Sequence, residues 1–300
     1  MRLATFIHDG RRQVGIVSAD GALVQPLRFS PAAADKGVLA FVKDAAAGTR
    51  LPEPEGAPIA LREVVLEAPI PLPRRNIFCV GRNYHDHAKE LSGSVFKDNS
   101  PYPAAWPIVF TKVPECVIGT AQPVQLPGAI STQIDYEAEL AVVIGKGGRN
   151  IPRDDAMAHV FGYTIVNDVT ARDVQMRHQQ WDLGKSFDTF CPMGPWLVTA
   201  DELDGQGTRV RCWVNGELRQ DARTSDLIFD IPTLIETCSR GITLLPGDII
   251  ATGTPSGVGM GMKPPVFLQA GDKVRIEIDG IGVLENVFVP APEAPSASPP

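Results

Sequence analysis

The sequence predicts a mainly β protein with short helices, an α+β fold in which a small N-terminal domain precedes a larger one. Most apolar segments are short, rich in β-branched residues and bounded by Gly or Pro, which is typical of strands. Helical segments are fewer, and they do not alternate regularly with strands as a doubly wound sheet requires. The chain of 300 residues exceeds one minimal domain, so we expect one large domain with a smaller appendage.

The N-terminal region carries the signals of a separate small unit. Residues 1 to about 25 alternate apolar and polar side chains around two Asp-Gly turns, as the strands of a hairpin do. Residues 31–49 are rich in alanine and predict a short helix. Proline-rich clusters at 51–58 and 69–75 interrupt regular structure. We therefore expect a small N-terminal domain over residues 1–72.

Residues 73–289 are expected to form the main domain, and residues 290–300 a disordered tail, because the tail has no core-forming side chains. The predicted strands share β-branched residues between Gly or Pro breaks and cover 76–81, 107–112, 139–145, 163–168, 209–216, 248–253 and 273–288. The predicted helices are short and lie around 84–91, 153–160, 170–180 and 231–240.

Composition excludes several classes of function. A formal charge of −7 and a pI near 5.3 argue against a nucleic-acid partner, whose phosphates require a basic surface. A small anionic substrate remains compatible, since local cations and a metal can outweigh a weak global field. No apolar run reaches membrane-spanning length and no signal-peptide core is present, so we expect no membrane partner and a cytoplasmic location. The five scattered cysteines form no metal or disulfide spacing, which agrees with reduced thiols.

A run of acids begins the segment DYEAELAVVIG at residues 135–145. Asp135, Glu137 and Glu139 are two residues apart, so on a strand their side chains project from one face. Three like charges beside a buried strand repel one another and are costly to desolvate, and a cation between them offsets that cost. Oxygen ligands favour a hard ion such as Mg²⁺, Mn²⁺ or Ca²⁺ over zinc.

A fourth acid, Asp168, ends the predicted strand at 163–168, where it can complete a metal site with Glu137 and Glu139. The alternative interpretation is a solvated strand face, which is the commoner origin of acids at alternate strand positions. The apolar residues that follow Glu139 favour the metal site, because they indicate a buried strand.

The segment GRNYHDHAKEL at residues 81–91 combines histidines with an acid. On a helix, His87 and Glu90 are three residues apart, so the carboxylate can orient the imidazole and raise its basicity. Such a pair can act as a general base on a water molecule. The alternative is an ordinary surface helix with polar side chains.

Two glycine-containing segments supply candidate partners for an anion. GKSFDTF at 184–190 contains Lys185, but Gln179 stands where a phosphate loop requires its first glycine. Lys185 is therefore either a carboxylate or oxyanion contact beside a metal, or a surface lysine. ATGTPSGVGMG at 251–261 either offers backbone N–H groups and the Thr254 hydroxyl to an anion or forms a flexible turn.

Taken together, these segments resemble the fumarylacetoacetate hydrolase family. The matching runs occur in the family's order between residues 76 and 288: VGRNYHDHAKEL, VFTK, DYEAELAVVIG, VNDVTARDVQ, QWDLGKSFDTFCPMGPW, VNGELRQ and LLPGDIIATGTPSGVG. The resemblance implies a mixed β-sandwich roll and a homodimer. Residues 1–72 are similar to the small domain that many members carry.

The resemblance also implies functions for individual residues. The family's metal-binding acids fall on Glu137, Glu139 and Asp168. The usual ion in the family is Mg²⁺ or Mn²⁺. The catalytic positions, a His–Glu dyad and a lysine, fall on His87, Glu90 and Lys185. The positions that contact substrate fall on Arg82, Tyr84, Gln175 and Thr254.

The implied chemistry centres on an enolate of a small oxo-acid, with its charge stabilised by a metal and Lys185. His87 would deprotonate a water that attacks a distal carbonyl, so the first prediction is C–C hydrolysis of an acylpyruvate, a diketo acid such as fumarylpyruvate. The alternative is an isomerase, tautomerase or decarboxylase of 2-oxo or 2-hydroxy-dienoate acids, or of oxaloacetate, at the same metal site. A third hypothesis is a non-catalytic metal-stabilised binding protein. It is less favoured, because a binding protein does not need a base such as His87 or a lysine such as Lys185 beside the metal.

Overall fold

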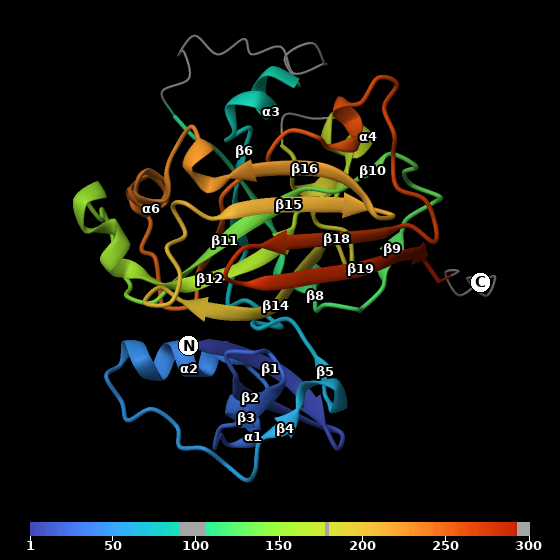
Figure 1. The fold of residues 1–300 in the computed structure, drawn as a ribbon. Coiled ribbons are helices and arrows are strands. Elements are labelled where there is room, and N and C mark those ends of the chain that lie inside the picture. The colour runs from blue at the N-terminus through green and yellow to red at the C-terminus, as the bar shows by residue number, and fades with distance from the viewer. Residues whose placement is uncertain (91–105, 178–179, 293–300) are drawn as a thin grey trace, which may run out of the picture.

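The structure is a computed structural model that describes residues 1–90, 106–177 and 180–292. Within these residues the strands form sheets of 12, five and two strands and the helices are short, which confirms the mainly β, α+β class. Figure 1 shows the N-terminal strands gathered at one end of the molecule, below the body formed by the rest of the chain. Most of the predicted tail at 290–300 lies outside the described residues, and its first residue, Pro290, ends a strand.

The 12-stranded sheet combines N-terminal strands with strands of the body. Its N-terminal strands are β1 (Arg2–His8), β2 (Arg11–Val17), β3 (Leu23–Pro26), β4 (Ile59–Ala60) and β5 (Val65–Leu66). Its later strands are β6 (Ile77–Gly81), β7 (Ile108–Lys112), β8 (Val117–Ile118), β11 (Ala138–Ile144), β12 (Val160–Asn167), β14 (Cys191–Thr199) and β17 (Ile249–Ala251). The path is β4-β3-β2-β1-β14-β12-β11-β17-β6-β7, with β5 paired to β1 and β8 to β14.

The five-stranded sheet lies against the large sheet and closes the main core. It runs in the order β16 (Glu217–Arg223), β15 (Arg209–Val214), β18 (Lys273–Ile278), β19 (Gly282–Pro290) and β9 (Val124–Leu126). The two-stranded sheet pairs β10 (Ile134–Asp135) with β13 (Thr170–Ala171). One buried cluster unites Leu140 and Ile165 of the large sheet with Val210 and Ile276 of the five-stranded sheet. The two sheets therefore pack as a sandwich around a common apolar layer.

The helices are short and lie between strands. The α-helices are α1 (Pro31–Ala34), α2 (Val38–Ala46), α3 (His85–Glu90), α4 (Arg172–Gln175), α5 (Asp182–Lys185) and α6 (Ile231–Ser239). The 3₁₀ helices are η1 (Leu61–Glu63), η3 (Pro114–Cys116), η4 (Arg153–His159), η5 (Thr224–Asp226) and η6 (Gly259–Gly261). The helix expected around 153–160 is thus a 3₁₀ helix. None of the helices formed by the described residues has the length and apolar content that a membrane span requires.

Strand β14 is the main element that the sequence pattern did not predict. It contains Pro192, Gly194 and Pro195, and both residue types are depleted in strands. Nevertheless it pairs with β1 on one side and β12 on the other, and every residue except Trp196 is buried. Burial between two partners outweighs the weak local propensity.

The N-terminal strands have a small core of their own, which includes Phe6 and Val24. They are nevertheless hydrogen-bonded to the body, because Arg2 and Leu3 of β1 lie opposite Val198 and Leu197 of β14. The expected boundary after residue 72 falls between β5 and β6, and it stays a prediction.

Candidate active site

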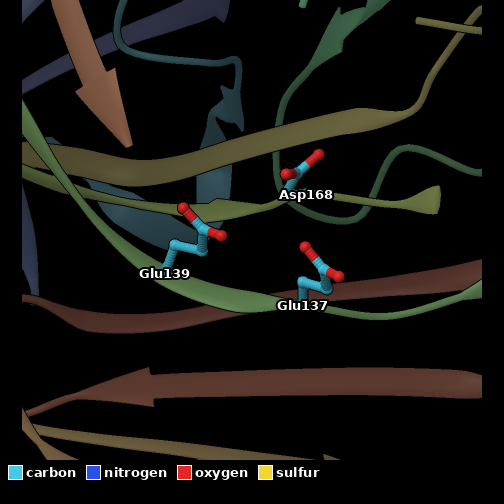
Figure 2. A group of neighbouring side chains, drawn as sticks. All are labelled: Glu137, Glu139 and Asp168. Carbon is cyan, nitrogen blue, oxygen red and sulfur yellow. The ribbon is translucent and has the colours of Figure 1, made fainter. Parts of the chain in front are cut away.

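The three candidate metal ligands lie where β11 pairs with β12. Glu137 immediately precedes β11, Glu139 belongs to it, and Asp168 follows the last residue of β12. The Asp168 amide donates to the Glu137 carbonyl across 2.9 Å, which continues the ladder between the two strands. Figure 2 shows Glu137 and Glu139 projecting from one strand toward the side on which Asp168 lies. All three are buried, and a carboxylate oxygen of each lies within 4.8 Å of the others.

Asp135 does not join this cluster, although the sequence pattern placed it on the same face as Glu137. The strand is interrupted between β10 and β11, so the alternation of side chains does not continue. The Asp135 carboxylate instead lies 2.8 Å from Arg172 Nε and accepts from the amides of Gly259 and Met260 at 2.7 and 2.9 Å. Its contacts are therefore structural, and the expectation of three acids on one continuous strand is wrong.

Three buried cations surround the carboxylates. Lys185 Nζ lies 2.7 Å from both Glu137 Oε2 and Asp168 Oδ2. Arg172 NH1 lies 2.7 Å from Glu137 Oε1, and Lys112 Nζ lies 2.8 Å from Asp168 Oδ1. Sequence reasoning identified Lys185 as a site residue but not Arg172 or Lys112. The signal for Lys112 was its position two residues after the inward-facing Phe110 on β7, since alternate strand positions share a face.

The electrostatics of the cluster fit a hard divalent cation. Burial alone would raise the pKa of Glu137, but the charges of Lys185 and Arg172 lower that pKa to about 2. The Glu139 carboxylate accepts a hydrogen bond from the Gly253 amide at 2.9 Å, and burial together with Asp168 and Glu137 raises its pKa well above the usual value. The Asp168 carboxylate is buried between two ammonium groups, with Lys112 Nζ at 2.8 Å from Oδ1 and Lys185 Nζ at 2.7 Å from Oδ2. A divalent ion among these oxygens would relieve the repulsion, and all-oxygen ligands suit Mg²⁺ or Mn²⁺.

The His–Glu dyad lies on α3. His87 is 3% exposed, and its Nδ1 lies 3.2 Å from Glu90 Oε2. Glu90 in turn accepts from the Gly257 amide at 3.0 Å. Gly257 has a φ of 101°, and a Cβ there would approach the Arg219 carbonyl oxygen to 1.9 Å, so only glycine fits. Because Nδ1 faces Glu90, Nε2 is the ring nitrogen left for a substrate.

The glycine-rich loop at 251–261 serves the protein's own carboxylates. The Gly253 amide donates to Glu139 and the Gly257 amide donates to Glu90, both from residues with positive φ. The Thr254 hydroxyl accepts from Gln220 Nε2 at 2.8 Å. Of the two interpretations left open by the sequence, the loop therefore offers its amides to anions, and these anions are site side chains.

These groups surround a cavity with an empty volume of about 330 Å³. Its lining residues are Val80, Gly81, Arg82, His87, Phe110, Glu137, Glu139, Arg172, Gln175, Trp181, Lys185 and Thr254. Three of the four expected substrate contacts, Arg82, Gln175 and Thr254, are thus brought to it. Tyr84 is buried but does not line the cavity, and its hydroxyl has no hydrogen-bond partner among the described residues. The aromatic wall of Phe110 and Trp181, whose ring centroids are 5.2 Å apart, was not identified from the sequence.

Comparison with known proteins agrees with this architecture. The family model described as fumarylacetoacetate hydrolase C-terminal matches residues 76–289. Oxaloacetate tautomerase YisK of Bacillus subtilis (strain 168) is 54% identical over 228 residues, which span 76% of this chain and 74% of that protein.

Two solved structures extend the likeness to almost the whole chain. Fumarylacetoacetate hydrolase from the psychrophilic Exiguobacterium antarcticum has a TM-score of 0.81 and 41% identity, covering 97% of this chain and 100% of that one. Maleylpyruvate hydrolase from Sphingobium sp. SYK-6, solved with manganese(II) and pyruvate, has a TM-score of 0.75 and 35% identity over the same shares. The family expected from the sequence motifs is confirmed: the chain belongs to the fumarylacetoacetate hydrolase family.

Proposed function

We propose that this protein is a divalent-metal-dependent tautomerase that interconverts the keto and enol forms of oxaloacetate. The observation that carries this choice is the 54% identity to an oxaloacetate tautomerase over 228 residues. The sequence motifs placed C–C hydrolysis first and enol chemistry on oxaloacetate among the alternatives. The similarity to a tautomerase supports the alternative better than the first prediction.

Glu137, Glu139 and Asp168 are the residues that would hold the metal, with Mg²⁺ or Mn²⁺ as the expected ion and Ca²⁺ as a further hard cation with the same ligand preference. When bound, such an ion supplies a Lewis acid that polarises the 2-oxo group of the substrate. Arg172 and Lys185 add fixed positive charge on the protein side, which favours an anionic oxo-acid in the cavity.

Proton transfer at the substrate's C3 is assigned to His87. In the direction from keto to enol, Nε2 takes the C3 proton while Nδ1 donates to Glu90, whose carboxylate stabilises the imidazolium. Lys185 Nζ lies at the cavity wall, where it can donate to the C2 oxygen as negative charge develops there. The His87 imidazolium then passes this proton to the C2 oxygen, which completes the enol. In the reverse direction, His87 takes the proton of the enol hydroxyl and returns it to C3.

The remaining lining residues are assigned to the far carboxylate of the substrate. Arg82 offers a guanidinium, and Gln175 and Thr254 offer further polar atoms at the same cavity.

The second candidate is hydrolysis of an acylpyruvate. The His87–Glu90 dyad favours it, because an oriented imidazole can equally deprotonate a water molecule. The 35% identity to maleylpyruvate hydrolase supports it as well. The two reactions differ in their products, since hydrolysis of an acylpyruvate releases pyruvate and a second acid, whereas tautomerisation releases nothing.

The test is to dilute enol-oxaloacetate into buffer with protein and Mg²⁺ or Mn²⁺, and to follow the loss of enol absorbance alongside coupled detection of pyruvate. We expect the loss to exceed the spontaneous rate without pyruvate formation, and to return to the spontaneous rate in metal-stripped protein. Pyruvate from oxaloacetate would instead identify a decarboxylase. Rapid pyruvate release from fumarylpyruvate or maleylpyruvate, with no acceleration on enol-oxaloacetate, would replace the proposal by the hydrolase.

Two further sequence expectations, a homodimer and a cytoplasmic location, stay predictions. Light scattering on the purified protein measures the first, since a dimer has about twice the chain mass of 32.3 kDa. Fractionation of the source cells measures the second.

A further inference from the structure

Lys112 is a fully buried cation that the proposed mechanism does not use. It ends β7, and its side chain is 0% exposed. A lysine is almost never fully buried unless it is paired, because its charge must be taken out of water. Lys112 does not line the cavity, so it has no direct route to a substrate.

The ammonium group of Lys112 contacts three parts of the site at once. It forms an ion pair of 2.8 Å with Asp168 Oδ1, and it donates hydrogen bonds to the carbonyl oxygen of Val169 at 3.1 Å and to that of Lys185. An ammonium has three hydrogens to donate, and three oxygens from two separate segments surround this one. One charge therefore ties the Asp168 segment to the last residue of α5.

These contacts constrain two residues of the site, the proposed metal ligand Asp168 and the proposed catalytic residue Lys185. Asp168 follows the last residue of β12, and its amide is held by the Glu137 carbonyl, but that backbone bond leaves the orientation of the carboxylate to its side-chain contacts. Lys185 ends a helix of four residues, which is too short to hold its position without tertiary contacts. Lys112, at the end of β7, contacts both of these segments. The two segments also contact each other, because Lys185 Nζ lies 2.7 Å from Asp168 Oδ2.

We propose that Lys112 is a positioning residue that holds Asp168 and Lys185 in their mutual geometry and thereby sets the affinity of the site for its divalent metal. It acts as outer partners of metal ligands do, by orienting a carboxylate that would otherwise choose among several orientations. Arg172 contacts Glu137 Oε1, but it lines the cavity, so a substrate can use it directly. Lys112 has only the positioning function.

This inference rests on the proposed metal site but not on the choice of reaction, so its test measures metal binding in the absence of substrate. Titration calorimetry with Mn²⁺ compares the parent protein with Lys112→Met, which keeps the chain length but removes the charge and the donors. We expect Mn²⁺ to bind about 10–100-fold more weakly, as when an outer partner of a metal ligand is lost. Lys273→Met is the matched control, since Lys273 is half exposed and pairs with Glu285 on the other sheet; it should bind Mn²⁺ like the parent.

A double substitution shows whether Lys112 acts through Asp168. In the metal-free protein, Lys112→Met should lower the free energy of unfolding by less in an Asp168→Asn background than in the parent, because residues that act through one another are not additive. At saturating Mn²⁺, Lys112→Met should also keep a lowered kcat with little change in KM, since Lys185 has lost its tether.

The outcomes separate this inference from the proposed function. A parent protein that binds no Mn²⁺ contradicts the metal-dependent function itself. A folded Lys112→Met that binds Mn²⁺ within twofold of the parent overturns only the positioning function. If Lys112→Met does not fold, Lys112→Gln, which keeps an amide donor, takes its place; failure of both to fold would assign Lys112 to the fold and overturn the proposal as well.

Discussion

The carboxylate cluster and the His87–Glu90 dyad belong to one site, yet the protein holds them in different ways. The cluster stands on paired strands inside the large sheet, with buried cations bonded to Glu137 and Asp168. The dyad stands on a helix of six residues, anchored through Glu90 to the amide of one loop glycine. The difference teaches that charge stabilisation is built into the sheet, whereas the proton-transfer group is held by a short helix and a loop. A substitution in the dyad should therefore impair proton transfer without weakening metal binding.

The largest expected effect comes from removing the base. His87→Ala should lower kcat by about 10²–10⁴-fold, the usual contribution of general acid–base catalysis. Its affinity for Mn²⁺ should not change, because His87 bonds to Glu90 and to none of the three metal-binding carboxylates. Steady-state rates at saturating metal and calorimetric titration with Mn²⁺ measure the two properties.

His85→Ala is the control for this prediction, because His85 lies on the same helix but is exposed. It should leave both kcat and Mn²⁺ affinity unchanged. Parallel loss of metal affinity and activity in His87→Ala would break the comparison, since the dyad would then be part of the metal site.

The second prediction concerns the cluster itself and contrasts two of its acids in the metal-free protein. Glu137→Gln removes the partner of both Lys185 and Arg172, so it should lower the free energy of unfolding by about 3 kcal/mol, the lower end for breaking a buried ion pair. Glu139→Gln removes a carboxylate that faces two others, so it should leave that free energy unchanged or raise it. Urea unfolding after metal removal measures both.

Both substitutions should abolish tight Mn²⁺ binding, which makes each the control for the other. An equal loss of stability in the two variants would show that the cations are shared across the whole cluster. The distinction drawn between Glu137 and Glu139 would then be wrong.

The smallest expected effect is the pH dependence of metal binding. Burial and the neighbouring carboxylates raise the pKa of Glu139, so the metal-free fold retains a proton that its unfolded chain would release. A metal binds the ionised form, so binding should release a proton, and the affinity should fall about tenfold per pH unit below that pKa. Calorimetry in buffers of different ionisation enthalpy counts the proton. A count of zero in the parent would contradict the raised pKa of Glu139.

In the metal-free protein, the lowered pKa of Glu137 makes the free energy of unfolding depend on pH in the opposite sense to the raised pKa of Glu139. Because Lys185 and Arg172 outweigh burial and lower this pKa from 4.5 to about 2, the stabilisation is present above pH 4.5 and is lost as the pH falls toward 2. The cluster therefore contains two carboxylates whose titrations favour the fold in opposite pH ranges.

Strand pairing explains which parts of the fold were predictable. The apolar runs of β6, β11 and β17 are visible because a strand buried on both faces is apolar along its length. β14 was missed because prolines hide a strand whose burial depends on β1 and β12, its neighbours in space. The break before β11, which leaves Asp135 paired with Arg172 and outside the carboxylate cluster, is likewise a tertiary feature.

By itself, the sequence determined the α+β class and, through its motifs, the family, because residue type and alternation along a strand are local properties. It predicted that Glu137, Glu139 and Asp168 belong to one site, and the pairing of β11 with β12 brings them together. Only the tertiary structure decided which cation meets which carboxylate. Lys112 and Arg172 reach the cluster from β7 and α4, far along the chain from β11, and no local pattern encodes such a contact. The charge balance that prepares the site for a metal is therefore a property of the folded chain.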